Sequence, residues 1–383
     1  MVKFSIVNSQ ISSRLNMVAK VINSKNVLPV LNNIIFSVGN NTLTLMGSDS
    51  ENTLITTIEL PTCEGEEFFG VPTRDICEAM KNLPSEAVIN FSQDGNKLMV
   101  DFQNGSFSLT TVNADDFPKA SEPEAGSNTF NMTDNELLEG ITRTIQTTAN
   151  EELRPVMNGI YMDLLSDKLA MVACDGHSLA RYYLKDVLPS ATDEDGNQRT
   201  GSFILPKKPA NILKGILTKK SDNIEITFDD KSVTFKAELF TLHSRLIEGR
   251  YPNYNSVIPK SLPYTMTINR KDLYDSLRRV SPFANDSSKL IVFSISANSL
   301  NIMAEDFDFS KTASENINCS YDGSTLRIGF KSTSIMELLD NTTSEEVMIK
   351  LGDATTAAII LPVTEEENME LLMLQMPMIL AGN

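Results

Sequence analysis

Four sequence patterns recur three times along the chain in the same order, and this repetition limits the possible folds more than any other feature. The first pattern, an alternating strand that leads into a helix, begins at Phe4, Phe130 and Tyr264. These starts are 126 and 134 residues apart. A single similarity of this kind can arise by chance, but four in the same order indicate a triplicated domain.

The other three patterns follow the first in each copy. An alternating strand that ends at an aspartate reads NTLTLMGSD, DKLAMVACD and NSLNIMAED, and its last residues are Asp49, Asp175 and Asp306. A strand followed by a helix reads FFGVPTRDICEAMKNL, SFILPKKPANILKGIL and LRIGFKSTSIMELLD. Each copy then closes on a residue pair that ends in proline, at 117–118, 251–252 and 376–377. We therefore predict three similar domains, over residues 1–126, 127–258 and 259–383.

Each predicted domain is of the α+β class, with antiparallel sheets and two helices. Apolar residues alternate along Leu98, Val100 and Phe102, as expected for an antiparallel strand with one buried face. Apolar residues three or four positions apart, such as Ile11 and Leu15, indicate amphipathic helices between such strands. Helices are predicted over 10–26, 73–83, 133–150, 206–221, 269–285 and 330–341.

The stretch ACDGHSLARYY, from Ala173 to Tyr183, resembles part of an active site because Cys174, Asp175 and His177 lie close together. The other two copies carry SEN and FDF after their aspartates, so no histidine recurs at this place. An aspartate at a strand end is better explained as a turn residue whose side chain binds local backbone N–H groups. The sequence has no Gly-rich phosphate loop and no recognised hydrolase motif, and we predict no catalytic residues.

The composition is that of a soluble globular protein, with 41% hydrophobic and 22% charged residues. The N-terminal segment becomes polar after a few residues and no apolar run reaches membrane-spanning length, so we expect neither export nor a membrane partner. The four cysteines lie far apart with no C-x-x-C pair, which disfavours disulfides and a zinc site. We therefore expect a cytoplasmic protein with reduced thiols, no metal and no cofactor.

Charge is divided unevenly between the predicted helices and the rest of the chain. The chain carries 33 basic and 50 acidic residues, a net charge of −17, which alone argues against nucleic acid as a partner. The six predicted helices contain 16 basic and 9 acidic residues, whereas the remainder contains 17 and 41. If all six helices face a common surface, that surface can hold a polyanion while the rest of the chain repels it. The basic residues opposite the apolar stripes are Lys20, Arg143, Lys207, Lys208, Lys214, Lys271, Arg278 and Arg279.

Taken together, these features resemble the bacterial replicative DNA sliding clamp, the beta subunit of DNA polymerase III. The resemblance rests on three tandem strand-rich copies with two helices each, on DGHSLA in the middle copy, on EGRYPNYNSVIPK at the second junction and on LQMPMIL near the C-terminus. It covers the whole chain, and its motifs are specific in their combination and order.

The resemblance implies a ring-forming DNA clamp fold that encloses double-stranded DNA. Members of the family are head-to-tail homodimers, in which six similar domains form a closed ring that is lined by helices and walled by sheets. Basic residues on the lining attract phosphates without reading bases, so binding is not sequence-specific. The implied role is a non-catalytic subunit that gives DNA polymerase its processivity. By position, the residues that resemble family residues near the duplex are Lys25, Arg143, Arg154, Lys207 and Lys208.

The resemblance also implies a pocket for short linear peptides of the polymerase III catalytic subunit, the clamp loader and repair polymerases. His177 then lines a pocket and is not a catalytic base. Apolar walls that contain methionines suit a site that accepts several partners. The positions that match pocket residues are Met157, Cys174, Gly176, His177, Leu179, Pro252, Val257, Leu374, Met376, Pro377, Met378 and Leu380.

Three pocket positions depart from the better-known members, which commonly carry arginine where this chain has Ser178, Ser256 and Ile379. The weaker positive charge leaves the preferred peptide motif open, and the chain continues past Leu380 with three further residues. Positions at the family's dimer interface are occupied by Leu83, Phe107, Phe283 and Ala284. The first two of these fit equally well as core residues of their own domain.

Two other interpretations remain open. One is a hydrolase that uses Asp175 and His177, and loss of turnover on replacing His177 would support it. The other is a repeat scaffold that does not bind DNA. A scaffold of that kind gives no reason for positive charge to concentrate on helices, which favours the clamp.

Overall fold

The computed structural model describes residues 1–124, 127–192, 195–220, 222–364 and 367–380. The chain forms two compact units. Unit 1 comprises Met1–Asn135 and Asn211–Leu246, and unit 2 comprises Glu136–Ala210 and Ile247–Asn383. The middle copy of the repeat therefore contributes to both units. The domain limits 1–126, 127–258 and 259–383 stay a prediction.

Six α-helices are present among the described residues, two in each copy of the repeat, as predicted. All six end before the predicted residue, and after the fourth helix Lys219 has a φ of 58°, a left-handed conformation through which an α-helix does not continue. The helices are α1 (Asn8–Ala19), α2 (Thr73–Lys81), α3 (Asp134–Thr144), α4 (Lys207–Ile216), α5 (Arg270–Val280) and α6 (Ser332–Asp340). Short 3-10 turns are η1 (Pro29–Asn32), η2 (Ile145–Thr147), η3 (Pro155–Met157), η4 (Tyr254–Ser256) and η5 (Ser281–Phe283).

Strands make up most of the remaining structure. Those of the first copy are β1 (Val2–Val7), β2 (Asn33–Gly39), β3 (Thr42–Ser48), β4 (Asn52–Glu59), β5 (Cys63–Glu64), β6 (Glu67–Pro72), β7 (Val88–Asp94), β8 (Lys97–Phe102), β9 (Gly105–Thr110) and β10 (Val112–Asn113). Those of the middle copy are β11 (Asn128–Thr133), β12 (Gly159–Leu164), β13 (Leu169–Cys174), β14 (Ser178–Leu184), β15 (Gly201–Pro206), β16 (Asn223–Phe228), β17 (Ser232–Lys236) and β18 (Thr241–Arg245). Those of the third copy are β19 (Tyr264–Asn269), β20 (Leu290–Ser296), β21 (Ser299–Asp306), β22 (Lys311–Asn318), β23 (Ser320–Tyr321), β24 (Leu326–Lys331), β25 (Glu346–Leu351), β26 (Ala358–Pro362) and β27 (Met369–Gln375).

The paired strands are antiparallel, as predicted, and they form four sheets. Unit 1 holds a five-stranded sheet in the order β5-β1-β7-β8-β9 and a nine-stranded sheet in the order β10-β6-β2-β3-β4-β18-β17-β16-β11. Unit 2 holds a nine-stranded sheet in the order β15-β12-β13-β14-β27-β26-β25-β19-β23 and a four-stranded sheet in the order β22-β21-β20-β24.

Both nine-stranded sheets run from one copy of the repeat into the next. In unit 1, β4 of the first copy pairs with β18 of the middle copy, and Leu54 lies opposite Leu242. In unit 2, β14 of the middle copy pairs with β27 of the third copy, and Ala180 lies opposite Met373. The five-stranded sheet ends at β5 and β9, and the four-stranded sheet ends at β22 and β24. Each of these four strands, β9 and β22 included, has one edge without a strand partner among the described residues.

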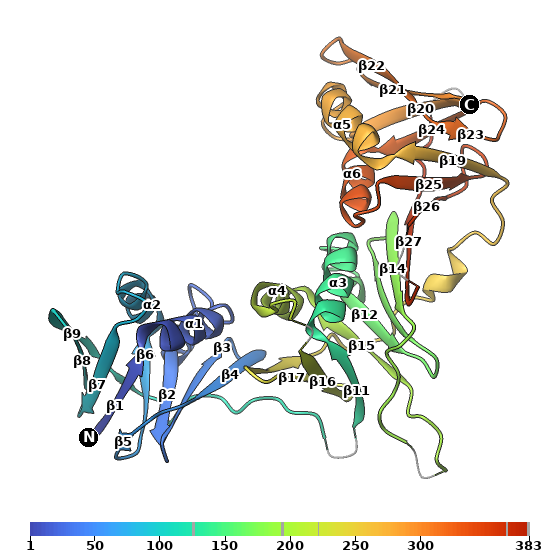
Figure 1. The fold of residues 1–383 in the computed structure, drawn as a ribbon. Helices are drawn as coiled ribbons and strands as arrows, with labels where there is room; N and C mark the ends of the chain where they lie inside the picture. The colour runs from blue at the N-terminus through green and yellow to red at the C-terminus, as the bar shows by residue number, and fades with distance from the viewer. Residues whose placement is uncertain (125–126, 193–194, 221, 365–366, 381–383) are drawn as a thin grey trace. The chain divides into compact units, whose positions relative to one another are not determined.

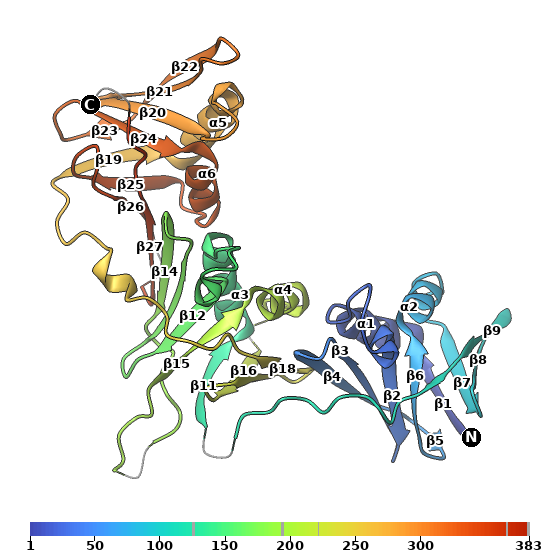
Figure 2. The same cartoon turned by 180° about the vertical axis from the view of Figure 1, so that it is seen from behind.

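Helices cover one face of the sheets in each unit (Figures 1 and 2). In unit 1, α1 packs against α2 and against β3 and β4, and its stripe of Ile11, Leu15 and Val18 is fully buried. In unit 2, α5 packs against α6, β21 and β22, and it buries Leu273 and Leu277. The polar side of each of these helices is directed away from the core.

Candidate functional site

Each copy of the repeat has an aspartate at the end of a strand, and its carboxylate organises the turn that follows. Asp49 Oδ1 accepts hydrogen bonds from the backbone N–H groups of Glu51 and Asn52, at 3.0 and 2.7 Å. Asp175 Oδ1 accepts from the second and third residues after it, at 2.8 and 2.6 Å. Asp306 Oδ1 accepts the same two bonds at 3.1 and 3.4 Å. The predicted turn role of these aspartates is confirmed.

The geometry around Asp175 disfavours a hydrolase. Its carboxylate accepts hydrogen bonds from the backbone N–H groups of His177 and Ser178, so this oxygen does not orient the imidazole. Burial raises the pKa of the Cys174 thiol, which suppresses the thiolate that a nucleophile needs. Gly176 has a φ of 91°, a conformation that favours glycine in a tight turn. The stretch is therefore a structured turn that exposes a histidine.

An apolar cluster in unit 2 adjoins this turn, on strands and connecting segments of the middle and third copies. Its buried members are Ala170, Val172, Leu179, Ile204, Tyr251, Tyr254, Ala357, Ile359, Leu372 and Leu374. Tyr161 stacks on Tyr251 at this cluster, with ring centroids 4.6 Å apart. The predicted pocket residues Leu179 and Leu374 belong to the cluster, and Cys174 packs against it. These three residues are thus brought together in one apolar cluster, in which Leu179 and Leu374 are buried and Cys174 is half-buried.

The C-terminal segment after β27 lies beside the same turn. Met376 N donates a hydrogen bond to the carbonyl oxygen of His177, and Met378 N donates to that of Gly329, both at 2.8 Å. Leu380 is only 7% exposed and packs over Gly329, where a Cβ atom would lie 2.6 Å from its Cδ2 atom. The segment is therefore fixed to the turn before β14 and to β24.

Several predicted pocket residues expose apolar surface around this segment. Met376 is 40% exposed, Val257 is 51% exposed and Ile379 is 93% exposed. Pro252 is exposed as well, whereas Met157 is buried. Exposed apolar side chains next to a preformed apolar cluster suit an extended peptide that carries apolar anchors.

The two serines that replace arginine near this surface are already hydrogen-bonded within the chain. Ser178 is buried, and its hydroxyl donates to Gln375 Oε1 at 2.8 Å. The Ser256 hydroxyl donates to the carbonyl oxygen of Asn253 at 2.6 Å. Gln375 is a polar residue of this region that sequence reasoning missed, because its partner is distant in the sequence.

Arg154 lies beside the turn, although the sequence suggested only that it faces DNA. Its Nη1 atom is 3.0 Å from the place that a Cβ atom would take on Gly176. Its Nη2 atom forms an ion pair with Glu151 at 2.7 Å, and both side chains are nearly half exposed. Arg154 therefore places a guanidinium that is already paired with Glu151 beside the turn. In the sequence, the sign that Arg154 lies near the pocket is that it precedes the predicted pocket residue Met157 by three positions.

Most of the basic residues predicted to face DNA are exposed on the surface. Lys20 follows the last turn of α1, and its Nζ atom is 3.1 Å from the place that a Cβ atom would take on Gly215 of α4. A lysine of the first copy thus lies beside a helix of the middle copy within unit 1. The exposed members of the set are Lys20, Lys25, Arg154, Lys214, Lys271, Arg278 and Arg279.

Lys207 and the exposed Arg279 of this set are engaged with neighbouring side chains. Lys207 Nζ donates a hydrogen bond to Asn150 Oδ1 at 2.9 Å, and burial lowers the pKa of this lysine. Arg279 forms an ion pair with Glu315 at 2.6 Å. Lys208 is half-buried. The contacts of Lys207 and Arg279 reduce the positive charge and the hydrogen-bond donors that these side chains can present to a phosphate.

Arg143, at the end of α3, makes several contacts within unit 2. Its guanidinium donates to Glu139 Oε2 from two nitrogens, at 3.1 and 2.9 Å, and to the carbonyl oxygen of Asn341 at 3.0 Å. It also lies 5.4 Å from the centre of the Tyr182 ring. The side chain is 17% exposed and lines a hollow in unit 2 together with Thr342. Arg143 therefore joins α3 to the loop after α6.

The four predicted interface residues lie in different environments. Phe283 is 40% exposed, in the 3-10 turn η5 that packs against β21 and β22. Leu83 and Phe107 are half-buried, and the Phe107 ring lies 6.3 Å from the Phe102 ring. Ala284 is buried, so its side chain is covered by its own chain. Phe283 is thus the member of the set with the most exposed apolar surface.

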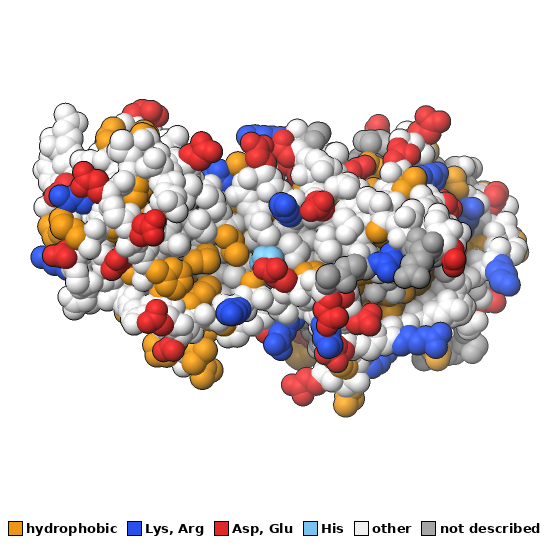
Figure 3. Space-filling view, turned by 90° about the horizontal axis from the view of Figure 1, so that it is seen from below, with side chains coloured by type: hydrophobic (Ala, Val, Ile, Leu, Met, Phe, Trp, Pro, Cys, Tyr) orange, Lys and Arg blue, Asp and Glu red, His pale blue; other side chains and the backbone are white. Residues whose placement is uncertain are grey.

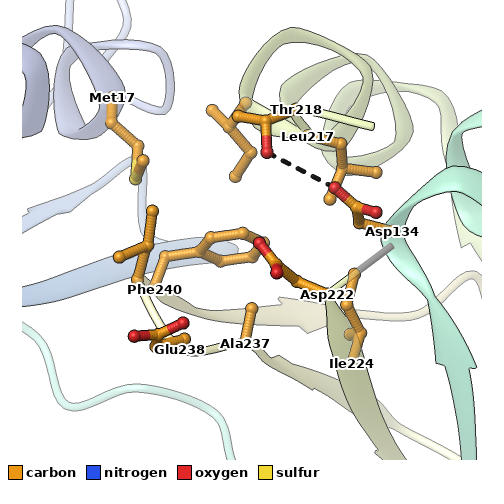
Figure 4. A pocket seen from close by; sticks show the side chains of 11 residues that line it. Met17, Asp134, Leu217, Thr218, Asp222, Ile224, Ala237, Glu238 and Phe240 are labelled. Carbon is orange, nitrogen blue, oxygen red and sulfur yellow. Dashed lines mark hydrogen bonds between the residues drawn. The ribbon is translucent and has the colours of Figure 1, made fainter. Parts of the chain in front are cut away.

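A separate hollow lies in unit 1, between the end of α4 and the turn from β17 to β18 (Figure 4). The Thr218 hydroxyl donates a hydrogen bond to Asp134 Oδ2 at 3.4 Å in this hollow. Its lining residues are Met17, Asp134, Ile216, Leu217, Thr218, Asp222, Ile224, Ala237, Glu238, Leu239 and Phe240. None of the site residues predicted from the sequence lines it.

Neither a metal-binding cluster nor a membrane-spanning helix is found in the described ranges. Within them, no group of three or more His, Cys, Asp or Glu residues is placed to hold a metal ion. No helix in the same ranges is long and apolar enough to cross a membrane. The face drawn in Figure 3 carries acidic and basic side chains interspersed, with hydrophobic side chains in patches between them.

Comparisons with known proteins decide between the interpretations. Models of the N-terminal, central and C-terminal domains of the DNA polymerase III beta subunit match residues 2–121, 131–253 and 255–378. The chain belongs to the DNA polymerase III beta subunit family. The beta sliding clamp of Pseudomonas putida is 30% identical to it over 359 residues, which cover 93% of this chain and 95% of that protein.

Solved structures of beta subunits have the same fold. A crystal structure of the DNA polymerase sliding clamp from Pseudomonas aeruginosa with ligand has a TM-score of 0.92 and 27% identity, and the match covers 99% of this chain and 100% of that chain. A sliding clamp from the same organism bound to griselimycin has a TM-score of 0.91 and 26% identity, with the same coverage. The predicted clamp fold of three tandem domains is confirmed.

Proposed function

We propose that this beta subunit works as a head-to-tail homodimeric ring that encircles duplex DNA and tethers polymerases to it. The main support for a ring is the pair of open sheet edges at β9 and β22. By its place in the repeat, β9 is the counterpart of β18 and β27, and β22 is the counterpart of β4 and β14. The junctions β4·β18 and β14·β27 form within one chain. The third junction, β22·β9, requires a second copy.

The existing junctions predict the register of the third one. Leu54 on β4 pairs with Leu242 on β18. Leu54 lies opposite the second residue before Asp49, and Ala313 lies opposite the second residue before Asp306, so Ala313 is the counterpart of Leu54. Leu242 and Phe107 each belong to the third residue pair from the tip of their hairpin, so Phe107 is the counterpart of Leu242. Phe107 of one copy should therefore lie opposite Ala313 of the other. Two such junctions close a ring of six domains, which leaves no sheet edge open at the junctions.

Exposed basic residues on the helices support contact with the DNA backbone. Lys20 and Lys214 are exposed in unit 1, and Lys271 and Arg278 are exposed on α5. Such side chains bind phosphates and do not read bases, so the ring can slide along any sequence. Because enclosure retains the ring, each contact can stay weak.

We also propose that the apolar surface beside His177 binds short linear peptides of the polymerase III catalytic subunit, the clamp loader and repair polymerases. Support comes from the buried cluster around Leu179 and from the exposed side chains of Val257 and Met376. Arg154, which is 47% exposed, can pair with an acidic residue of a peptide in exchange for its ion pair with Glu151. In this role the chain is a processivity subunit of the cytoplasm and catalyses no reaction.

Retention on circular DNA tests the encircling ring. The chain is loaded by its clamp loader with ATP onto nicked circular DNA, and the complex is isolated by gel filtration at high salt. We expect the ring to stay on circles and to leave once a restriction enzyme cuts them. Blocking both ends of the cut DNA with bound proteins should restore retention. Equal retention on circles and on DNA with open ends would contradict encirclement.

Replacing Phe283 with aspartate tests the homodimer. The new charge is buried only when two copies meet, so Phe283→Asp should give folded monomers in native mass measurements. Val88→Asp is the matched control, because Val88 is 55% exposed on β7, an inner strand of its sheet. The control should stay dimeric. If the Phe283→Asp variant stays dimeric, Phe283 does not lie in the interface.

A further inference from the structure

The turn between β21 and β22 presents two aromatic side chains to solvent. Phe307 is 81% exposed and Phe309 is 66% exposed. The backbone of the turn is held by Asp306 Oδ1, which accepts hydrogen bonds from the N–H groups of Asp308 and Phe309. Lys311 Nζ also lies 5.0 Å from the centre of the Phe309 ring. Two exposed rings on a hydrogen-bonded turn are typical of a surface that a partner covers.

This turn is longer than its counterparts in the other copies. Two residues lie between the aspartate and its backbone partner in the first and middle copies, namely 50–51 and 176–177. Four residues, 307–310, lie between Asp306 and its partner Lys311 in the third copy. The longer turn places Phe307 and Phe309 between the end of β21 and the start of β22.

The shorter turns indicate what a turn at this place contacts. Arg245 N, just at the end of β18, donates a hydrogen bond to the carbonyl oxygen of Glu51 at 2.9 Å. Met376 N, just after β27, donates to the carbonyl oxygen of His177 at 2.8 Å. Each turn therefore lies against the chain that leaves the neighbouring strand. At the third junction the neighbouring strand is β9, and the chain that leaves it begins at Thr110.

An exposed apolar surface lies two residues beyond Thr110. Val112 is 38% exposed and pairs with Gly70, and its Cγ2 atom is 2.7 Å from the place that a Cβ atom would take there. Phe68 is 42% exposed and lies two residues before Gly70 on β6, so it points to the same face. Ile35, a member of a buried cluster, pairs with Gly70 on β2 and lies on this same face, 3.3 Å from the same Cβ position.

We propose that Phe307 and Phe309 pack onto Phe68 and Val112 of a second copy of the chain. The inference rests on the proposed head-to-tail homodimer and adds a specific aromatic contact to the β22·β9 junction. A second copy fits this surface because the turn continues the edge strand β22, while the receiving residues follow the edge strand β9. The aromatic turn thus closes over the end of the strand pairing and shields it from water.

Sedimentation equilibrium of the full chain tests the contact. The double variant Phe307→Ser, Phe309→Ser should raise the dissociation constant of the dimer by at least about tenfold, because two apolar anchors are lost. The matched control Leu153→Ser, Leu188→Ser removes two other exposed apolar side chains and should change that constant less than about twofold. A double variant with the wild-type constant would overturn this inference and leave the homodimer standing. A wild-type chain that stays monomeric would overturn the proposed homodimer itself.

A designed cross-link tests the location of the turn independently of affinity. Thr110→Cys and Ser310→Cys in one chain should form a disulfide between two copies under mild oxidation, and should give covalently joined dimers on a denaturing gel. Thr110→Cys with Ser296→Cys, at the far end of β20, is the control and should stay monomeric on the gel. Absence of cross-linked dimers from the first pair would place the turn away from the partner's Thr110 and overturn the inference.

Discussion

Replacing Gly329 with alanine should release the C-terminal segment from β24 and thereby weaken the candidate peptide site. The new Cβ atom would lie 2.6 Å from Leu380 Cδ2 and 2.9 Å from the carbonyl oxygen of Met378. Atoms cannot approach this closely, so the segment has to move. Leu380 then loses its buried position, and the hydrogen bond from Met378 N to the Gly329 carbonyl, now 2.8 Å long, is broken.

The size of the effect follows from these two contacts. Burial of a leucine side chain contributes about 2 kcal/mol, and one backbone hydrogen bond contributes about 1 kcal/mol. The free energy of unfolding of the C-terminal part should therefore fall by about 2–3 kcal/mol. If the released segment also removes one apolar anchor point from a bound peptide, peptide affinity should fall about tenfold.

Two measurements on the same variant check this reasoning. Fluorescence anisotropy gives the affinity for a labelled glutamine-led peptide that ends in leucine and phenylalanine, and denaturant unfolding gives the stability. Gly39→Ala is the control, because its Cβ atom would meet only the exposed, flexible Glu66 side chain, at 3.0 Å. Unchanged stability of Gly329→Ala would refute the packing argument. Lower stability with wild-type peptide affinity would remove the C-terminal segment from the peptide site.

Two further predictions concern charge. Lys20→Glu with Lys214→Glu should weaken retention on DNA and reduce the salt dependence of binding by about one in slope for each lysine lost, whereas Lys231→Glu with Lys236→Glu, on a strand and its turn, should not. An unchanged slope in binding titrations at several salt concentrations would show that these lysines do not contact the DNA. Burial lowers the pKa of His243 in the folded chain, so below its unfolded value of about 6.5 the unfolded chain binds more protons. The free energy of unfolding should therefore fall as the pH drops below that value, and His243→Gln should flatten the loss measured by denaturant unfolding at pH 5 to 7; an identical loss in both proteins would disprove the assignment.

The repeat made the element order predictable because its signals are local. The turn role of Asp175 could be inferred by comparing it with Asp49 and Asp306, and the same hydrogen bonds recur at all three. The apolar stripe of α1 also reports directly which side is buried. Helix ends were less predictable, because the left-handed conformation of Lys219 is not visible in the hydrophobic pattern.

Side-chain partners could not be predicted because they come from distant parts of the chain. Arg143 donates to the carbonyl oxygen of a residue 198 positions away, and Ser178 donates to one 197 positions away. The charge of Arg154 reveals neither its ion pair with Glu151 nor its place beside the turn. Periodicity distinguishes the buried side of a helix from its outer side. It does not tell which outer charges are already neutralised.

The three aspartate turns also have a consequence for protein engineering. In each turn the carboxylate of the aspartate holds the backbone, and the side chains at the tip contribute none of these bonds. The natural change from two tip residues to four leaves antiparallel pairing intact on both sides. A short insertion at the 50–51 tip, of the two extra residues that the third copy carries, should therefore keep β3 and β4 paired, and it should cost only the hydrogen bond from Arg245 N to the Glu51 carbonyl oxygen.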